Sequence, residues 1–402
     1  MSKKNFLADT LKTMSSTLLI AFSLQLIAYP VINHIVGNKV FGEILTIYTI
    51  LTIASVVLGN TLNNIRLINV KHFAPAYYYK KFLSTLVISI FLESFVLLLI
   101  FKLAFHIGKW EVFWLIKLNI LMCLRIYLNV FFRMTLKYNQ ILWIAIAQFI
   151  GMMAGLGAFK LVGNWIIVFL ISELFAVGCT LVLLRNLTKG KEKEPKINIL
   201  KDYVMLLSTN GLNNFNLYLD RLILLPIIGG TAVTISFLAT FIGKMLATFL
   251  YPINNVILSY ISVHESDNIK KQYLSTNIYS LIAVVIVMII CYPLTILIVS
   301  MFYHLETATY SKFIIIGNLG VLFNAVSIMV QTLNTKHSSI TKQANFITLH
   351  TVVYIGLTIV ITLVFGLEGY FWSTLIANII KFIALNVIGI KTSKYAIKEG
   401  IE

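Results

Sequence analysis

The sequence predicts an all-α polytopic membrane protein with twelve transmembrane helices. Three observations predict this class. Of the 402 residues, 59% are hydrophobic and only 12% are charged, whereas a soluble domain carries roughly 25% charged residues. Apolar runs of about 20 residues, the length that crosses a hydrocarbon core, recur along the whole chain. Apolar residues are consecutive in these runs, as in 281–290, which favours helices over the alternating strands of a membrane barrel.

The apolar runs and the polar gaps between them place each predicted helix. The twelve predicted spans are 14–35, 40–62, 82–106, 111–133, 140–162, 164–185, 203–227, 231–259, 274–303, 309–333, 344–366 and 369–390.

The distribution of lysine and arginine predicts the orientation. With the N-terminus placed inside, the inner segments hold 22 Lys and Arg residues, and the outer segments hold five. Cytoplasmic loops carry such an excess, so both termini are predicted to be cytoplasmic, in a multi-pass protein of the cell (cytoplasmic) membrane. The same rule accounts for the net charge of +17, so nucleic acid is not a predicted partner. The five outer residues are Lys39, Lys102, Lys109, Lys160 and Lys312.

A charged stretch near the middle of the chain divides it into two halves. The predicted organisation is an N-terminal six-helix bundle over 1–184, a cytoplasmic linker over 185–202 and a C-terminal six-helix bundle over 203–402. Residues 37–55 and 229–248 resemble each other in pattern, and each opens the second helix of its half. Two halves that enter in the same sense indicate a parallel repeat about an axis along the membrane normal.

Eight ionisable residues lie well inside the predicted spans, away from the span ends. Each costs about 2.5–3.5 kcal/mol on insertion scales, so each is a functional candidate. Five are basic and three are acidic, so pairing among them leaves positive charge over. That surplus predicts a central cavity suited to an anionic ligand. The eight are Lys117, Arg125, Arg221, Lys244 and Lys381, with Glu93, Glu173 and Asp220.

The fourth span carries a basic ridge. Lys117, Arg125, Asn129 and Arg133 share one face of that helix. One interpretation is a track for a phosphate-bearing head group, because arginine binds phosphate with two parallel hydrogen bonds. The other is that Lys117 and Arg133 extend to the two membrane interfaces while Arg125 forms a structural pair with Glu93 or Glu173.

The seventh span carries a polar stripe, with Asn210, Asn214 and Arg221 on one face and Asp220 beside it. Polar residues at this density line a cavity or bind neighbouring helices, and both interpretations remain open. The same two interpretations, cavity lining and binding to a neighbouring helix, apply to Lys244 and Lys381, which lie mid-span without an acid nearby in sequence.

The acidic residues allow two roles. Glu93, Glu173 and Asp220 could carry protons in ion-coupled transport, because a buried carboxyl binds and releases a proton. Charge pairing with the basic residues is the simpler interpretation and is favoured. No nucleotide-binding loop, metal-ligand spacing or catalytic nucleophile motif stands out, so no cofactor, metal or enzymatic activity is predicted.

Three stretches resemble the polysaccharide-repeat-unit flippases (O-antigen, capsule or teichoic type) of the multidrug/oligosaccharidyl-lipid/polysaccharide exporter superfamily. They are 36–42 (VGNKVFG), 58–60 (LGN) followed by Arg66, and 216–224 (NLYLDRLIL) followed by Gly229 and Gly230. The layout resembles the family over the whole chain. One departure is 231–233 (TAV), where the family usually has glycine and tyrosine.

The resemblance implies a flippase that moves undecaprenyl-pyrophosphate-linked oligosaccharide repeat units across the membrane by alternating access, with two six-helix bundles around a central cationic cavity. It adds weight to Arg66 and Arg221 as substrate contacts. Membrane lipids and other polysaccharide-assembly proteins are the further expected partners. Two alternatives are weighed: an ion-coupled small-molecule exporter of the same superfamily, and a membrane-embedded glycan polymerase, which the short outer loops disfavour.

Overall fold

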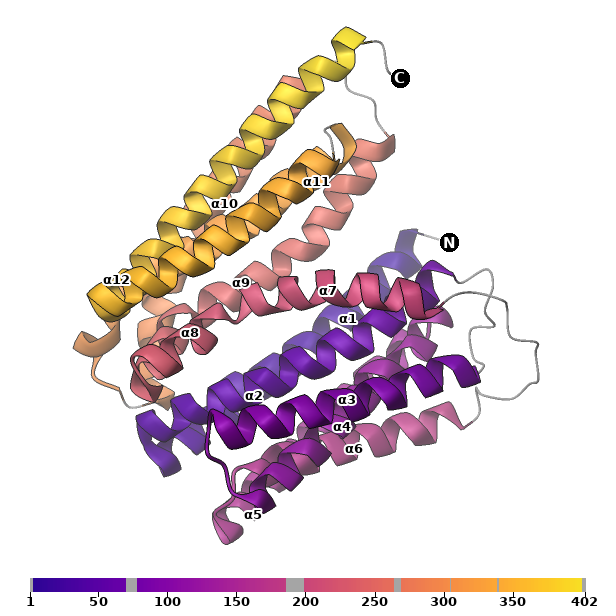
Figure 1. Cartoon of the computed structure of the whole chain (residues 1–402), viewed down its shortest axis with the longest axis vertical. Coiled ribbons are helices and arrows are strands. Elements are labelled where there is room, and N and C mark those ends of the chain that lie inside the picture. The colour runs from indigo at the N-terminus through magenta and orange to yellow at the C-terminus, as the bar shows by residue number, and fades with distance from the viewer. Residues whose placement is uncertain are drawn as a thin grey trace. The chain divides into compact units, whose positions relative to one another are not determined.

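A computed structural model describes residues 3–69, 78–185, 199–263, 269–303, 305–337 and 340–399, and every element within these ranges is helical. Figure 1 shows them in chain order. The N-terminal elements are α1 (Lys3–Phe22), a π-helical turn (Ser23–Ala28), α2 (Tyr29–Ile68), α3 (Lys80–Leu103), α4 (Lys109–Met134), α5 (Tyr138–Val162) and α6 (Ile166–Leu184). The C-terminal elements are α7 (Ile199–Leu217), α8 (Leu219–Ile227), α9 (Gly230–Val263), α10 (Ile269–Phe302), α11 (Thr307–His337) and α12 (Ile340–Glu399).

The helices confirm the predicted polytopic class and its twelve passes. Nine helical stretches of the described chain are long and apolar enough to cross a membrane. Two of them, Leu11–Leu67 and Lys342–Lys391, each hold two predicted passes. The passes join at Gly37 (φ 79°) and Gly366 (φ 61°), whose backbone angles side-chain-bearing residues rarely adopt. The helices α7 and α8 together occupy the remaining predicted span.

The seventh predicted span, 203–227, is not one continuous helix. The helix ends at Leu217 and a short helix begins at Leu219. The N–H of Tyr218 donates to the carbonyl of Phe215, three residues back, at 3.2 Å. Such an i→i−3 bond tightens the last turn of a helix. The break therefore separates the asparagines of α7 from Asp220 and Arg221 of α8.

The chain forms two compact units. The first comprises Met1–Ile35 and Thr46–Tyr218, and the second comprises Val36–Leu45 and Leu219–Glu402. Thus α7 belongs to the first unit, and the segment 36–45 at the start of the second pass belongs to the second unit. The predicted boundary at 203 instead places α7 in the C-terminal half and 36–45 in the N-terminal half. Most of the predicted linker, 186–198, lies outside the described residues. The division into two sets of six helices stays a prediction.

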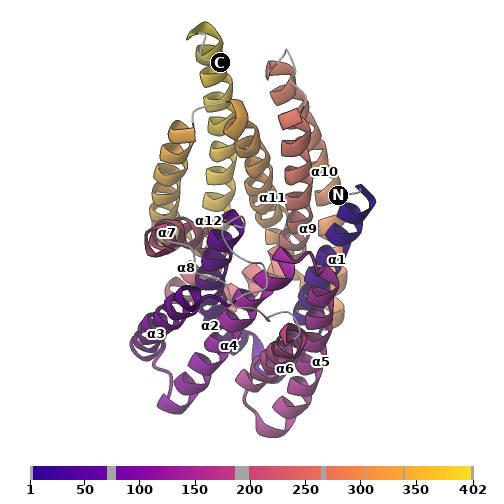
Figure 2. The ribbon, with the colours of Figure 1, turned by 90° about the vertical axis from the view of Figure 1, so that its right-hand side faces the viewer.

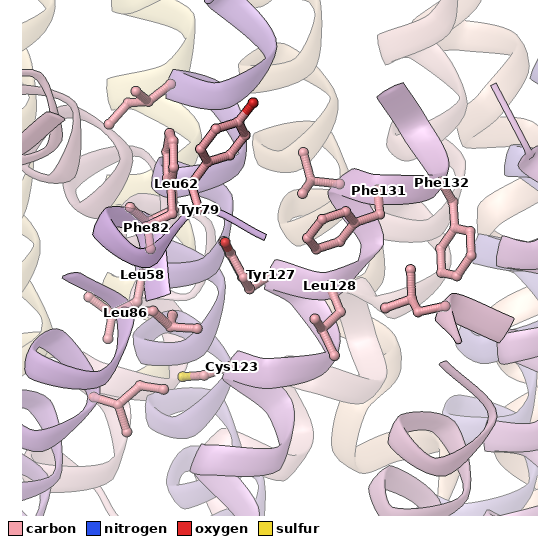
Figure 3. Close-up of a cluster of buried hydrophobic side chains, with 14 of the residues drawn as sticks. Leu58, Leu62, Tyr79, Phe82, Leu86, Cys123, Tyr127, Leu128, Phe131 and Phe132 are labelled. Carbon is pink, nitrogen blue, oxygen red and sulfur yellow. The ribbon is translucent and has the colours of Figure 1, made fainter. Parts of the chain in front are cut away.

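The first unit buries an apolar and aromatic core between its helices. Leu58 and Leu62 of α2, Phe82 and Leu86 of α3 and Tyr127 of α4 belong to this cluster, with Phe131 and Phe132 further along α4 (Figure 3). Figure 2 shows α5 packed along α6 in the same unit. Most of α3 turns outward with its apolar side chains exposed, as expected of a helix that faces lipid.

The second unit packs α10, α11 and α12 side by side (Figure 1). Its core includes Val326 and Val330 of α11 and Leu385 of α12. The segment 36–45 joins this unit through backbone contact: a Cβ placed on Gly42 would lie 1.8 Å from the carbonyl oxygen of Gly230. The two helices therefore meet where only glycine fits.

Candidate functional site

The eight predicted mid-span charges fall into two sets, one inside each unit. The first unit holds Glu93, Lys117, Arg125 and Glu173, and the second holds Asp220, Arg221, Lys244 and Lys381. Each set combines an ion pair with at least one charge that has no oppositely charged partner among the described residues.

Arg125 forms a buried ion pair with Glu173. Its Nε lies 2.6 Å from Glu173 Oε2, and the Glu173 side chain is only 2% exposed. Gln148 Nε2 donates to the other carboxylate oxygen at 3.0 Å, and Ser172 Oγ donates to the Gln148 carbonyl at 2.9 Å. The ion pair thus joins α4 to α6, with α5 contributing the amide. Of the two partners considered for Arg125, the structure has Glu173.

The ends of the α4 ridge are exposed. Lys117 places its Nζ 4.3 Å from the ring centre of Phe113 and 4.7 Å from that of Trp114, in cation–π contacts. Arg133 lies near the other end of the helix and is also exposed. These positions fit side chains that extend to the two interfaces. The phosphate track along the ridge stays a prediction.

Glu93 of α3 interacts with α4 through neutral groups. Asn119 Nδ2 donates to Glu93 Oε2 at 2.9 Å, and the Cys123 thiol donates to the same oxygen at 3.5 Å. No lysine or arginine of the described chain pairs with Glu93. The predicted pairing between Arg125 and Glu93 is therefore not present. Asn119 was not among the predicted site residues.

Arg66 is fully buried in an aromatic cage. Its Cζ lies 4.4 Å from the ring centre of Phe131, 5.4 Å from that of Tyr79 and 5.8 Å from that of Phe82. In Figure 3 the rings of Tyr79, Phe82 and Phe131 belong to one buried cluster. The cage fixes one end of α2 against α3 and α4. A substrate contact by Arg66 stays a prediction, since its side chain is covered in this structure.

Replacing Arg66 with lysine should destabilise the first unit. The compact ammonium cannot stack on several rings as the planar guanidinium does. We expect a loss of about 1–2 kcal/mol, measured as a lower melting temperature of the detergent-purified protein. Arg133→Lys, an exposed change on α4, is the matched control and should leave the melting temperature unchanged. Equal melting temperatures for the Arg66 variant and the wild type would contradict the stabilising role of the cage.

The asparagines of the predicted stripe bind within the first unit. Asn210 Nδ2 donates to Thr61 Oγ1 of α2 at 2.9 Å. Asn214 Nδ2 donates to the carbonyl of Asn210 at 2.8 Å. Both hydrogen bonds are partly buried. The contact with Thr61 is of the kind that holds neighbouring membrane helices together, and a cavity-lining role stays a prediction.

The second unit contains a cluster in which cations outnumber carboxylates. Lys244 Nζ of α9 lies 2.8 Å from Asp220 Oδ2 of α8. Arg221 follows Asp220 in the chain, and its Cζ lies 5.3 Å from the ring centre of Phe237. Asp220 is the only carboxylate among these three side chains, so the cluster keeps a net positive charge.

Lys381 of α12 lies mid-span without a carboxylate partner in the described chain. Its Nζ donates to Asn324 Oδ1 of α11 at 2.9 Å. A neutral amide satisfies one of the three ammonium donors and removes none of the charge. Lys381 is therefore a charged group that can accept an anionic partner.

Sequence reasoning missed three buried or partly buried asparagines, two of which bind mid-span charges. Asn119 and Asn324 bind Glu93 and Lys381. Asn318 of α11 accepts a hydrogen bond from the backbone N–H of Gly243 at 3.0 Å and is fully buried. Each of these asparagines lies mid-helix in an apolar run of the sequence. A polar residue at such a position was the signal that could have identified them. Within the described residues, no three His, Cys, Asp or Glu side chains are grouped as metal ligands would be.

The helices and their intramembrane charges define the class of a multi-pass membrane protein. No family model matches the chain, and a search of curated proteins finds no match. Solved structures do match. The chain resembles the lipid II flippase MurJ in its inward closed conformation, with a TM-score of 0.69 and 16% identity over 96% of this chain and 88% of that one.

Two MATE transporters are also similar. One is an outward-facing MATE transporter of the MOP superfamily, with a TM-score of 0.57 and 13% identity over 98% of this chain and 96% of that one. The other is from Vibrio cholerae, with a TM-score of 0.56 and 14% identity over 98% and 97% of the two chains. The chain shares the all-helical fold of these flippase and MATE structures, which confirms the predicted fold class.

Proposed function

We propose that the protein is a flippase that moves undecaprenyl-pyrophosphate-linked oligosaccharide repeat units across the cytoplasmic membrane by alternating access. The observation that carries this proposal is the mid-span ammonium of Lys381, which has no carboxylate partner in the described chain. The fold supports it, because the MurJ structure that it resembles is named a lipid II flippase.

The charge of the site favours an anionic substrate. An unneutralised cation inside the membrane is costly and is retained where it serves a function. A pyrophosphate would supply the missing negative charge through charge-assisted hydrogen bonds. In this proposal Lys381, Arg221 and Lys244 contact the head group in the second unit. The proposed contacts along its path in the first unit are Arg66, Lys117, Arg125, Arg133, Asn210 and Asn214.

The proposed orientation follows from the basic residues. The head group would be drawn from the side where 22 lysines and arginines gather, which we assign to the cytoplasm. Both termini then lie on that side. Other polysaccharide-assembly proteins acting on the same lipid-linked intermediate are the proposed partners.

An ion-coupled exporter of small molecules is the second candidate. It is supported by the likeness to MATE transporters over nearly their whole length. The mid-span charges disfavour cationic drugs as its substrate, because five of the eight are basic and three are acidic. Two of the three carboxylates, Glu173 and Asp220, are held in ion pairs.

The proposal is tested at Lys381. We expect Lys381→Gln to reduce translocation of a fluorescent undecaprenyl-pyrophosphate oligosaccharide in proteoliposomes by about tenfold or more, the equivalent of one hydrogen bond to a charged group. Lys381→Arg, which keeps the charge, should retain most of the activity. The melting temperature of Lys381→Gln should stay close to that of the wild type, because the glutamine amide can still donate to Asn324.

The control is Lys312→Gln. Lys312 pairs with Glu368, and both side chains are exposed. Its loss should leave translocation unchanged. Wild-type activity in Lys381→Gln at equal protein levels would refute the cationic site, and efflux of a cationic dye without movement of the pyrophosphate lipid would favour the exporter.

A further inference from the structure

One of the three mid-span carboxylates stands apart from the other two. Glu173 is paired with Arg125, and Asp220 is paired with Lys244. Glu93 forms no ion pair with any described residue. It lies near the middle of α3, where the adjacent Phe91, Leu92, Phe95 and Val96 are exposed as lipid-facing side chains.

In the described part of the chain, the side chains that hydrogen-bond to the Glu93 carboxyl are neutral. Oε2 accepts from the Asn119 amide at 2.9 Å and from the Cys123 thiol at 3.5 Å. Tyr203 of α7, whose side chain is 4% exposed, is the further titratable group that faces it. Thiol and phenol groups are uncharged at neutral pH.

The charged residues on the packed helices are engaged elsewhere. Arg125 of α4 is held by Glu173, and Lys117 of the same helix lies against Phe113 and Trp114. Arg66 of α2 is enclosed by its aromatic cage. Within the described helices, no fixed cation is therefore placed to stabilise an ionised Glu93.

The hydrogen bonds around Glu93 leave two acceptors without donors. Glu93 Oε1 and Asn119 Oδ1 are both buried and have no partner among the described residues, and Asn119 is 0% exposed. A protonated carboxyl carries one O–H donor. One proton thus removes the uncompensated charge and gives this pair of side chains the donor that it lacks.

We propose that Glu93 is the proton-binding site that couples transport to the proton gradient. The proposal rests on the proposed transport function. The step is a simple exchange: the carboxylic acid releases H⁺ and becomes a carboxylate, then takes up H⁺ again, and no group is oxidised or reduced. With the proton bound, the site between α3 and α4 is neutral and stable. Without it, the charge of Glu93 must reach water or a cation, which favours a different arrangement of α3.

A proton fits this site better than a sodium ion. A hard metal cation is bound by several oxygen ligands. Among the described side chains that face this site, the buried oxygens without a hydrogen-bond partner are Glu93 Oε1, Asn119 Oδ1 and Tyr203 Oη, and Cys123 contributes a sulfur. These are fewer than the roughly six oxygen ligands that hard cations take.

The first test is labelling with dicyclohexylcarbodiimide, an apolar reagent that modifies protonated carboxyls within membranes. We expect mass spectrometry of the purified protein to find the adduct at Glu93, with labelling that falls as pH rises from 5 to about 9, a window that covers the raised values of buried carboxyls. Glu173 and Asp220 are the internal controls and should stay unmodified, because each carboxylate is held in an ion pair. The proposal would be overturned if Glu93 is not labelled, or if its labelling does not depend on pH. It would also be overturned if sodium ions, and not a rise in pH, prevent the labelling.

The second test measures coupling. Glu93→Gln keeps a neutral side chain that can bind Asn119, so the melting temperature should hold, while acceleration of lipid translocation by an imposed pH gradient should be lost. Glu368→Gln, which removes an exposed carboxyl, should keep the full pH-gradient response. If Glu93→Gln responds to the gradient as the wild type does, the coupling role is wrong. If no lipid-linked oligosaccharide moves in the wild type but the labelling behaves as expected, the proposed substrate fails and the proton site stands.

Discussion

Gly42→Ala should prevent stable folding of the second unit. A Cβ at this position would lie 1.8 Å from the carbonyl oxygen of Gly230, and a Cβ on Gly230 would lie 2.0 Å from the carbonyl oxygen of Lys39. The obstructing atoms belong to the backbone, so no side-chain rotation relieves the clash. We expect each substitution to cost more than about 3 kcal/mol, the upper end for an overpacked site. The measurement is the yield and melting temperature of the monodisperse protein in detergent.

The chain provides matched controls for this clash. A Cβ on Gly157 or Gly178 would meet nothing within 4 Å, and both glycines lie inside membrane helices. Gly157→Ala and Gly178→Ala should be neutral or slightly stabilising, because alanine is favoured over glycine in a helix by roughly 0.5–1 kcal/mol. A Gly42→Ala protein as stable as these controls would show that the two helices do not meet as closely as described.

Arg125→Gln and Glu173→Gln should each destabilise the first unit strongly, while the double variant should recover most of the loss. Either single change leaves one charge without its ion-pair partner at the buried pair. Removing one member of a buried pair costs about 3–5 kcal/mol, whereas removing both is often nearly neutral. Thermal unfolding of all four proteins gives the coupling energy between the two side chains.

The double-mutant cycle also separates the two roles considered for Arg125. A purely structural Arg125 predicts that the double variant regains translocation along with stability. An Arg125 that also contacts the head group predicts recovered stability with translocation still reduced. If the stability loss of the double variant equals the sum of the two single losses, the two side chains are not coupled, and the ion pair is contradicted.

The fold was predictable because the membrane constrains the sequence so tightly. A spanning helix needs about 20 apolar residues, and the gaps between such runs fix the boundaries of each pass. The helices α3, α4 and α5 begin and end within a few residues of the predictions. The break at Tyr218 was not predictable, because it depends on a local backbone hydrogen bond. In the sequence, α7 and α8 form one continuous predicted span.

The positions of the charges were predictable, but their partners were not. Composition places Arg125 and Lys381 mid-span, yet whether a charge is paired depends on which helix faces it. Arg125 faces Glu173 across α4 and α6, while Lys381 donates to Asn324. The cage around Arg66 combines side chains from α2, α4 and the start of α3. Such tertiary contacts leave no periodic signal in one sequence.

The most direct test of the central claim compares two substrates in the same proteoliposomes. One is a fluorescent undecaprenyl-pyrophosphate oligosaccharide, and the other is the same sugar on an uncharged polyprenyl carrier. A cationic site predicts that the purified protein moves the first and leaves the second in its original leaflet. Equal movement of both lipids, or of neither, would contradict a site built to bind pyrophosphate.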